Sequence, residues 1–210
     1  MFQTLAAQFN AGGPFMWAIL MIFAIAIAVV LERTIYYFIF CGSNSGRLVH
    51  TISKALSENN VQETLGQLRK HKSPLHRLLA TALERYGAGA PISQIEEGVE
   101  EVSIKEIPRI SGRINYLSLI ANIATLVGLL GTIAGLQTSF SSLASAEAAQ
   151  KAAMLASGIA QAMNTTAFGL IVAVPCMVLF TLLSNKKQAL INDIDDAVVR
   201  VVNTMRNTRA

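Results

Sequence analysis

Four polar side chains lie close together in a segment whose composition is otherwise typical of a membrane helix. The segment 152–185 carries no charged side chain, yet it contains Gln161, Asn164, Thr165 and Thr166. Amides and hydroxyls donate and accept hydrogen bonds, and their oxygens can also bind small cations. An unpartnered polar group in hydrocarbon costs free energy, so we expect these side chains to face protein, water or a passing ion.

Two stripes of small residues accompany these polar groups. Between residues 121 and 139, small or hydroxylated residues recur every three or four positions, and a matching stripe runs from residue 158 to residue 173. Small residues let helix backbones approach closely in lipid, so we expect two helices to pack through these faces or to line a pore. Pro175 is expected to be a tolerated kink. The packing glycines are Gly128, Gly131, Gly135, Gly158 and Gly169.

Neither charge-free segment contains an acidic or basic side chain. Residues 114–146 and 152–185 contain no Asp, Glu, Lys, Arg or His. A proton relay inside a membrane normally needs an ionisable side chain, so another polypeptide would have to bring it. The simpler alternative is an ordinary packing face whose hydroxyls bond their own helix. We predict that a partner helix bearing a carboxyl faces Thr132, Thr165, Thr166, Gln161 and Asn164.

Other chemistries find little support in the residues. His50, His71 and His76 lack metal-ligand spacing and are expected to be solvated, while Cys41 and Cys176 are expected to be separate and inert. No nucleophile–base pair can be assembled, and the basic residues alternate with glutamates without an aromatic stacking platform. We therefore expect no enzyme activity, no cofactor, no metal site and no nucleic acid partner.

Composition predicts an all-α integral membrane protein. Of the 210 residues, 52% are hydrophobic and only 14% are charged, against about 25% charged in soluble domains. The first 31 residues are also free of charged side chains, and roughly 20 apolar residues suffice to cross the hydrocarbon. The three predicted transmembrane helices are 14–40, 114–141 and 158–184.

The distribution of Lys and Arg predicts the orientation. Ten of the 17 lie between residues 41 and 113 and five after residue 185, whereas none precedes residue 14. The positive-inside rule then places the N-terminus outside and the C-terminus inside. The resulting segments are a periplasmic N-terminus (1–13), a cytoplasmic helical domain (41–113), a short periplasmic loop (142–157) and a cytoplasmic C-terminal helix (185–210).

Apolar spacing predicts amphipathic helices over 47–57, 61–70 and 74–86 in the cytoplasmic domain. A further helix begins near Ile92, with the glutamates of 96–106 on its other faces as a wet surface or a subunit contact. No Gly/Ser cluster separates this helix from the second span. We therefore predict one long helix reaching about Ser141, with any kink near Pro108, and a third span that continues into the C-terminal helix.

Two segments resemble the second and third spans of the MotA/TolQ/ExbB proton channel family: GLLGTIAGLQTSF (128–140) and GIAQAMNTTAFGLIVAVPCMV (158–178). The stretch SPLHRLLATAL (73–83) is similar to the family's cytoplasmic region, and the three-span layout is similar to its ExbB/TolQ branch. The resemblance implies a homopentameric stator in the bacterial inner membrane around single-span partners of the ExbD/TolR type, whose membrane Asp carries the proton. It implies work on outer-membrane transport, envelope processes or motility, through a TonB/TolA-like transducer where one is used.

The resemblance also assigns residues. Thr132 and Thr166 correspond to the threonines that line the path near the partner's Asp. ExbB and TolQ proteins typically have Glu five residues before the second of these threonines, whereas this chain has Gln161. An amide does not titrate, so either the partner's Asp suffices, as in the motility branch, or the ion or output differs. Sodium coupling stays open because threonine and glutamine oxygens can bind Na⁺.

Two alternatives come from other functional classes. A non-conducting scaffold that merely binds partner helices would explain the absence of ionisable groups and the presence of Gln161. It does not explain why amides and hydroxyls gather opposite a glycine-rich helix. A small-solute carrier is disfavoured by three spans without an internal repeat or a charged anchor for the substrate.

Overall fold

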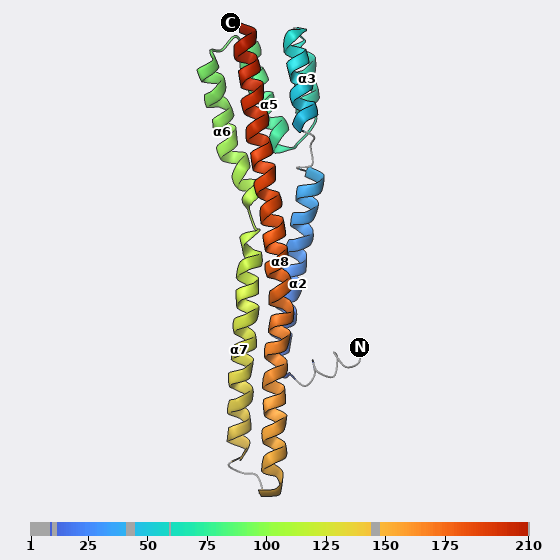
Figure 1. Cartoon of the computed structure of the whole chain (residues 1–210), viewed down its shortest axis with the longest axis vertical. Helices are drawn as coiled ribbons and strands as arrows, with labels where there is room; N and C mark the ends of the chain where they lie inside the picture. Colours follow the sequence, from blue (N-terminus) through green and yellow to red (C-terminus); the bar gives the residue numbers. More distant parts are fainter. Residues whose placement is uncertain (1–8, 10–11, 41–44, 59, 144–147, 210) are drawn as a thin grey trace. The chain divides into compact units, whose positions relative to one another are not determined.

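The computed structural model describes residues 9, 12–40, 45–58, 60–143 and 148–209, which are mostly helical and contain no strand. Most of the predicted N-terminal segment 1–13, part of the predicted loop 142–157, and Cys41 lie outside the described residues. The helices are α2 (Phe15–Ile35), a short π-helix (Tyr36–Phe40), α3 (Ser45–Ser57), α4 (Val61–Arg69), α5 (Pro74–Gly87), α6 (Ile92–Ser111), α7 (Asn115–Leu143) and α8 (Ala148–Arg209) (Figure 1).

The predicted all-α class with three membrane-spanning helices is confirmed. Three segments are long and apolar enough to cross a membrane, and they lie within Phe15–Ile39, Ile92–Leu143 and Ala149–Arg209. At 1.5 Å per residue, the 21 residues of α2 extend about 31 Å, close to the thickness of the hydrocarbon. The chain is therefore a multi-pass membrane protein.

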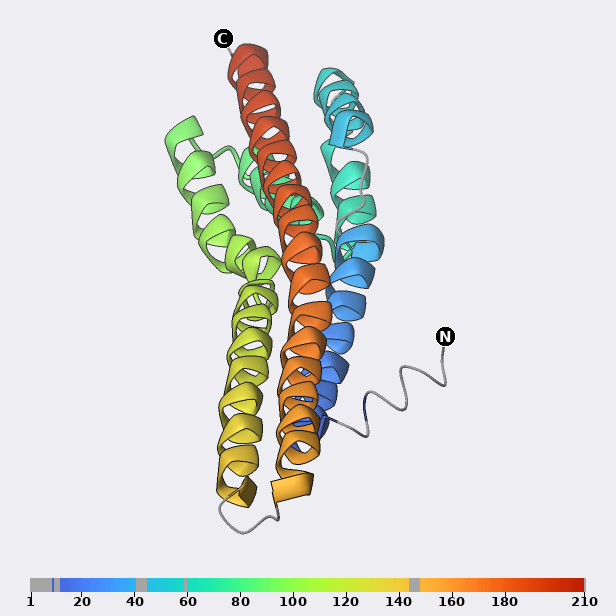
Figure 2. The same cartoon turned by 60° about the horizontal axis from the view of Figure 1, so that its bottom comes forward.

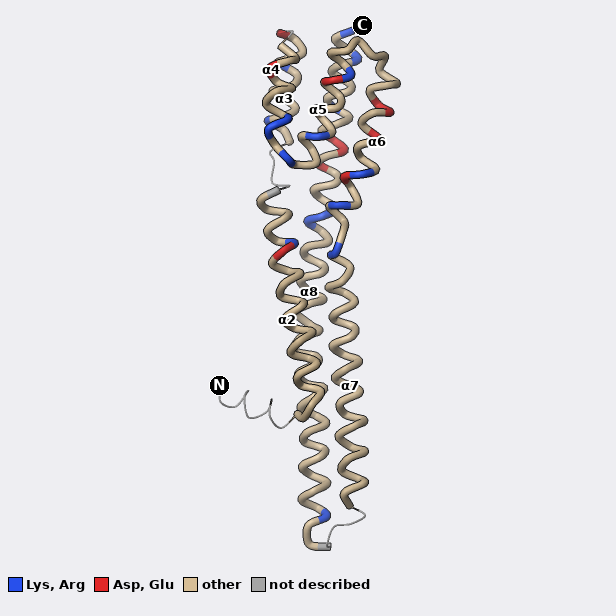
Figure 3. Tube along the Cα trace, turned by 180° about the vertical axis from the view of Figure 1, so that it is seen from behind, with Lys and Arg blue, Asp and Glu red and all other residues tan. Residues whose placement is uncertain are grey.

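The helices belong to two compact units. The first, here called the membrane unit, comprises Met1–Leu31 and Arg113–Leu182, and the second, the helical unit, comprises Glu32–Gly112 and Leu183–Ala210. Within the membrane unit, α2, α7 and the first part of α8 lie side by side (Figures 1 and 2). Charged residues are concentrated on the helices of the helical unit, while α7 is free of them (Figure 3).

The helical unit has a leucine-rich core. Leu78, Leu79 and Leu83 on α5 are at most 1% exposed, and Ile95 on α6 is fully buried. These residues recur at helical spacing, so one face of each amphipathic helix turns inward. The three short helices that we predict from this spacing agree closely with α3, α4 and α5.

The prediction of one continuous helix from Ile92 to Ser141 is wrong. Pro108 lies inside α6, and the interruption comes later, between Ser111 and Asn115. Pro108 removes one backbone donor, Gly112 is extended with ψ 149°, and Arg113 has φ 63°, a left-handed conformation that L-residues seldom adopt. The backbone therefore leaves the helix at Gly112 and starts a new one at Asn115. By contrast, α8 is continuous through Pro175 and begins at Ala148, ten residues before the predicted start of the third span.

Candidate functional site

The contact between α7 and α8 in the membrane unit is closest at glycines, where one of the two helices has no side chain. A Cβ atom added to Gly131 would lie 2.3 Å from Thr165 Cγ2, and one added to Gly169 would lie 2.7 Å from the carbonyl oxygen of Ala124. Real Cβ atoms do not approach other atoms this closely, so only glycine fits at either position. The two stripes of small residues thus meet face to face, with α7 and α8 antiparallel.

Other stripe residues continue this contact along both helices. A Cβ on Gly135 would meet Ala162 at 3.2 Å, and one on Gly158 would overlap the Ser139 hydroxyl. Ser139 satisfies its own hydroxyl by donating to the Gly135 carbonyl at 2.9 Å. Hydrogen bonds of this kind to the preceding turn let a hydroxyl sit in an apolar contact without a further partner.

Thr165 lies at the centre of the contact. It is fully buried, and its Oγ1 donates to the Gln161 carbonyl at 2.8 Å. The same hydroxyl lies 3.5 Å from the carbonyl oxygen of Gly12, in the turn that precedes α2. The structure therefore places Thr165 where three segments meet, with no exposed surface left for an ion or a partner helix.

Thr166 and Thr132 lie at the edge of the same contact. Thr166 is half-buried and donates to the Gly128 carbonyl across the interface at 3.1 Å, while half-buried Thr132 donates to Leu129 on its own helix at 2.5 Å. Thr166 directly follows buried Thr165, and Thr132 directly follows buried Gly131. In an antiparallel pair this equal offset turns both hydroxyls toward the same side of the helix pair.

Gln161 and Asn164 lie on the opposite flank of α8. At 100° per residue, Gln161 is about 140° and Asn164 about 160° around the helix from Thr166. Gln161 points its amide at the turn before α2, because a Cβ on Gly13 would come within 2.4 Å of Gln161 Nε2. Gly13 also has φ 74°, a conformation that suits glycine. The five polar residues grouped by sequence thus separate into a buried centre and two flanks.

Asn122 and Thr125 extend the polar flank of α7 on the Thr132 side. Both are exposed in the single chain, and Thr125 lies seven residues, or two helical turns, before Thr132. Asn122 makes no side-chain hydrogen bond to another described residue, whereas Thr125 donates to the Ala121 carbonyl at 3.1 Å. In a membrane helix such a flank calls for contact with protein or water.

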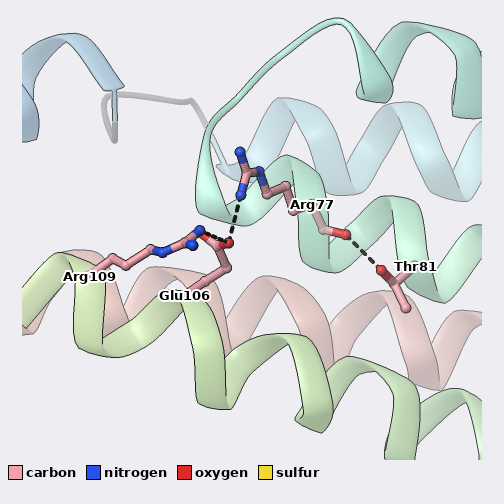
Figure 4. A network of polar contacts seen from close by, with 4 residues as sticks. All are labelled: Arg77, Thr81, Glu106 and Arg109. Atoms are coloured by element: carbon pink, nitrogen blue, oxygen red, sulfur yellow. Dashed lines mark hydrogen bonds and ion pairs between the residues drawn. The ribbon is translucent and has the colours of Figure 1, made fainter.

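A buried carboxylate in the helical unit was not expected from the sequence. Glu106 is only 6% exposed, and one of its oxygens accepts from Arg77 at 2.7 Å and from Arg109 at 2.6 Å (Figure 4). The expectation that the glutamates of 96–106 form a wet face is therefore wrong for Glu106. The contact is tertiary, because Arg77 comes from α5. The only sign of this burial in the sequence is the helical spacing, which puts Glu106 one turn before Ile110 and on the same face of α6.

The end of α6 is satisfied by side chains that come from the end of the first membrane helix. Tyr37 is fully buried and donates its hydroxyl to the Ile110 carbonyl at 2.9 Å, and Arg33 donates to the Arg109 carbonyl at 3.4 Å. The last carbonyls of a helix have no intrahelical donor, so these bonds replace the ones that the interruption at Gly112 removes. Sequence patterns gave no sign of this contact.

His76 also departs from its expected environment. It is 7% exposed rather than solvated, whereas His50 and His71 are exposed as expected. Burial, together with the nearby His71, lowers the pKa of His76 below the ordinary value for histidine. No group of three or more metal-ligating side chains gathers within the described ranges.

Comparison with known proteins places these features in a family. Residues 70–196 match the MotA/TolQ/ExbB proton channel family. A protein of Methanothermobacter thermautotrophicus described as a biopolymer transport protein ExbB homolog is 25% identical over 200 residues, which cover 95% of this chain and 67% of that protein. A biopolymer transport protein ExbB-like 3 of Synechocystis is 29% identical over 166 residues, 78% of this chain and 77% of that protein. The matched region contains α5, the break between α6 and α7, and both stripes of small residues. The chain belongs to the MotA/TolQ/ExbB proton channel family.

Proposed function

We propose that the chain is the stator subunit of a motor driven by the proton-motive force, in which α7 and α8 line the ion path. The family supports a channel or stator role in a membrane, and it is a transport family rather than an enzyme family. The observation that carries the proposal is the position of Thr132 and Thr166. Both lie half-buried on one side of a helix pair in which neither 115–143 of α7 nor 152–185 of α8 contains an Asp, Glu, Lys, Arg or His.

The hydrogen bonds of these threonines indicate how they would act. Each hydroxyl donates its proton to a backbone carbonyl, so the oxygen lone pairs are what it presents to a partner. Lone pairs accept a hydrogen bond from a protonated carboxyl but offer nothing to a carboxylate. Thr132 and Thr166 would therefore stabilise the neutral form of a partner's Asp as it passes. The same lone pairs would suit Na⁺, which keeps a sodium-driven, motility-type stator as the second candidate.

The proposed assembly follows the family. Copies of the chain, a pentamer by resemblance, would surround single-span helices of the ExbD/TolR type in the bacterial inner membrane, with a TonB/TolA-like transducer beyond. The charge distribution supports an outside N-terminus and a cytoplasmic location for 41–113 and 185–210. Each proton that crosses the membrane supplies about 2.3 kcal/mol per 100 mV, enough to break one or more interhelical contacts of roughly 0.6–2 kcal/mol.

The test is ion flux into liposomes that contain the chain with and without its single-span partner. A pH gradient and a sodium gradient are imposed separately, and Thr166→Val is compared with Thr181→Val, an exposed threonine of α8 that bonds only its own helix. We expect partner-dependent flux that falls about tenfold or more for Thr166→Val and is unchanged for Thr181→Val. Flux under the sodium gradient alone would identify the ion as Na⁺.

An absence of ion flux in this experiment needs its own control. Stators of this family can be plugged until they meet their target, so the partner is also tested without its periplasmic region. Flux that stays absent in an intact complex under both gradients would reject conduction and favour the scaffold. The backbone-bonded hydroxyls of Thr132, Thr165 and Thr166 are what such a scaffold would show.

A further inference from the structure

A basic cleft of about 430 Å³ opens in the helical unit between α4, α5 and α6, at the turn that joins α4 to α5. Its lining includes Arg69, His71, Lys72, His76, Arg77 and Lys105, with Glu106 as the single carboxylate among the residues that line it. Four permanent positive charges thus face one negative charge in a concave space. Such a surface concentrates anions.

The charges of this cleft are only partly neutralised by the protein. Glu106 is already bound by Arg77 and Arg109, while Arg69 pairs with Glu84 and Lys105 with Glu101 at the exposed surface. Exposed pairs of this kind contribute little to stability, so they can be exchanged for a ligand. Lys72 has no ion pair with any described residue.

The first turn of α5 adds backbone donors to the same place. Ser73 precedes the helix without a side-chain capping bond, and Pro74, at the first helical position, has no N–H. The N–H groups of Leu75 and His76 consequently have no acceptor within the helix. The positive end of a 14-residue helix dipole therefore points toward the turn that carries Lys72.

His76 gives an independent sign of an unfilled site. Its side chain is buried, its Nδ1 has no hydrogen-bond partner among the described residues, and its ring lies 4.6 Å from that of His71 between ring centres. The charged groups that line the cleft beside this pair are cationic apart from Glu106, and the α3 residues on the other side of the pair, among them Thr51, are neutral. A bound anion would satisfy this concentration of donors.

We propose that this cleft binds a phosphate group, carried either by an anionic phospholipid of the cytoplasmic leaflet or by a soluble phosphate compound. The lipid source is supported by position within the helical unit. Arg109, which shares Glu106 with Arg77, also receives a hydrogen bond from Arg33 at the end of the first membrane helix. The cleft therefore lies about one helical turn along α6 from the segment that leaves the membrane.

The experiment uses the full chain in phosphate-free buffer, with histidines labelled for NMR. Inorganic phosphate is titrated into the protein in neutral detergent, and separately the protein is placed in nanodiscs of phosphatidylcholine with or without phosphatidylglycerol. We expect the pKa of His76 to rise when the phosphate group binds, because an adjacent anion stabilises the imidazolium. Lys72→Ala should weaken binding by about tenfold.

Lys70→Ala is the matched control, since Lys70 lies two residues away, is exposed and does not line the cleft. It should change the affinity less than twofold. A rise of the His76 pKa with inorganic phosphate identifies a soluble ligand, and a rise only with phosphatidylglycerol identifies a lipid site. An unchanged His76 pKa under both conditions, or equal effects of Lys72→Ala and Lys70→Ala, would overturn the proposal.

Discussion

The membrane unit and the helical unit are both built from helices, but the helices inside each unit pack through different kinds of atoms. In the membrane unit, α7 and α8 touch where side chains are missing, as at Gly131 and Gly169. In the helical unit, leucines fill the core and Glu106 joins α5 to α6 through Arg77. Lipid offers no hydrophobic driving force between helices, so the α7–α8 contact depends on close approach and is sensitive to added atoms. The contact between α5 and α6 is sensitive instead to the removal of the side-chain atoms that form it.

The largest effect should come from Gly131→Leu in the membrane unit. The new side chain would collide with Thr165, which is buried and cannot turn away. Overpacking of this size costs more than about 3 kcal/mol. We expect loss of assembled protein in gel filtration, whereas Ala160→Leu, at an exposed position of α8, should purify normally. A Gly131→Leu variant that eluted as the wild type with its partner bound would contradict the steric account.

One methyl group placed in each unit gives the most direct comparison. Gly169→Ala would drive a Cβ against the Ala124 carbonyl, and we expect a loss of about 1–3 kcal/mol. Gly98→Ala on α6 would meet only the guanidinium of Arg85, a flexible and partly exposed group. There the gain in helix propensity, up to about 1 kcal/mol, offsets the displacement. Equal thermal stabilities of the two variants in detergent would remove the distinction between the units.

Glu106→Gln tests the helical unit by removing a charge without changing the volume. Two arginines lose their shared partner, but both are partly exposed and regain water. We therefore expect a loss of about 1.5–2 kcal/mol, near the lower end for hydrogen bonds to charged groups. Glu101→Gln, whose carboxylate is exposed, serves as the control and should leave the melting temperature unchanged. Identical melting of both variants would show that Glu106 contributes no more than a surface pair.

The smallest effect concerns pH. Because burial and His71 lower the pKa of His76 in the folded chain, the unfolded chain binds its proton more readily. Stability contributed by neutral His76 is present above the ordinary histidine value of about 6.5 and is lost as the pH falls below it. The melting temperature in phosphate-free buffer should drop slightly between pH 7.5 and 5.5, and less so in His76→Asn. If the melting temperature drops equally in the wild type and in His76→Asn, titratable groups other than His76 cause the drop.

Sequence patterns predicted the helices well where the periodicity was local. Apolar spacing was enough for α5, and the charge-free blocks were enough for three membrane-spanning segments. The break after α6 was missed because only the pair Ser111-Gly112 marks it. Together with Pro108, this pair ends the helix where side chains from elsewhere satisfy its last carbonyls.

Prediction was less successful where distant residues decide the outcome. Nothing near Glu106 in the sequence announces Arg77, which lies 29 residues away. The separation of Gln161 from Thr166 was different, since five residues correspond to 140° on a helix and the geometry was available from the spacing alone. The spacing therefore already separates Gln161 from Thr166 around α8. The roles of these residues in ion passage remain the proposal stated above.

The bonds from Tyr37 and Arg33 to the end of α6 have a consequence for the order of synthesis. These side chains are made 73 and 76 residues before the carbonyls that they satisfy. A chain still emerging from the ribosome therefore holds the finished end of its first membrane helix without its acceptors until Ile110 has been added. Closing so long a loop is a late and entropically costly step. A release or pause before that residue leaves the Tyr37 hydroxyl without the Ile110 carbonyl to which it donates in the finished chain.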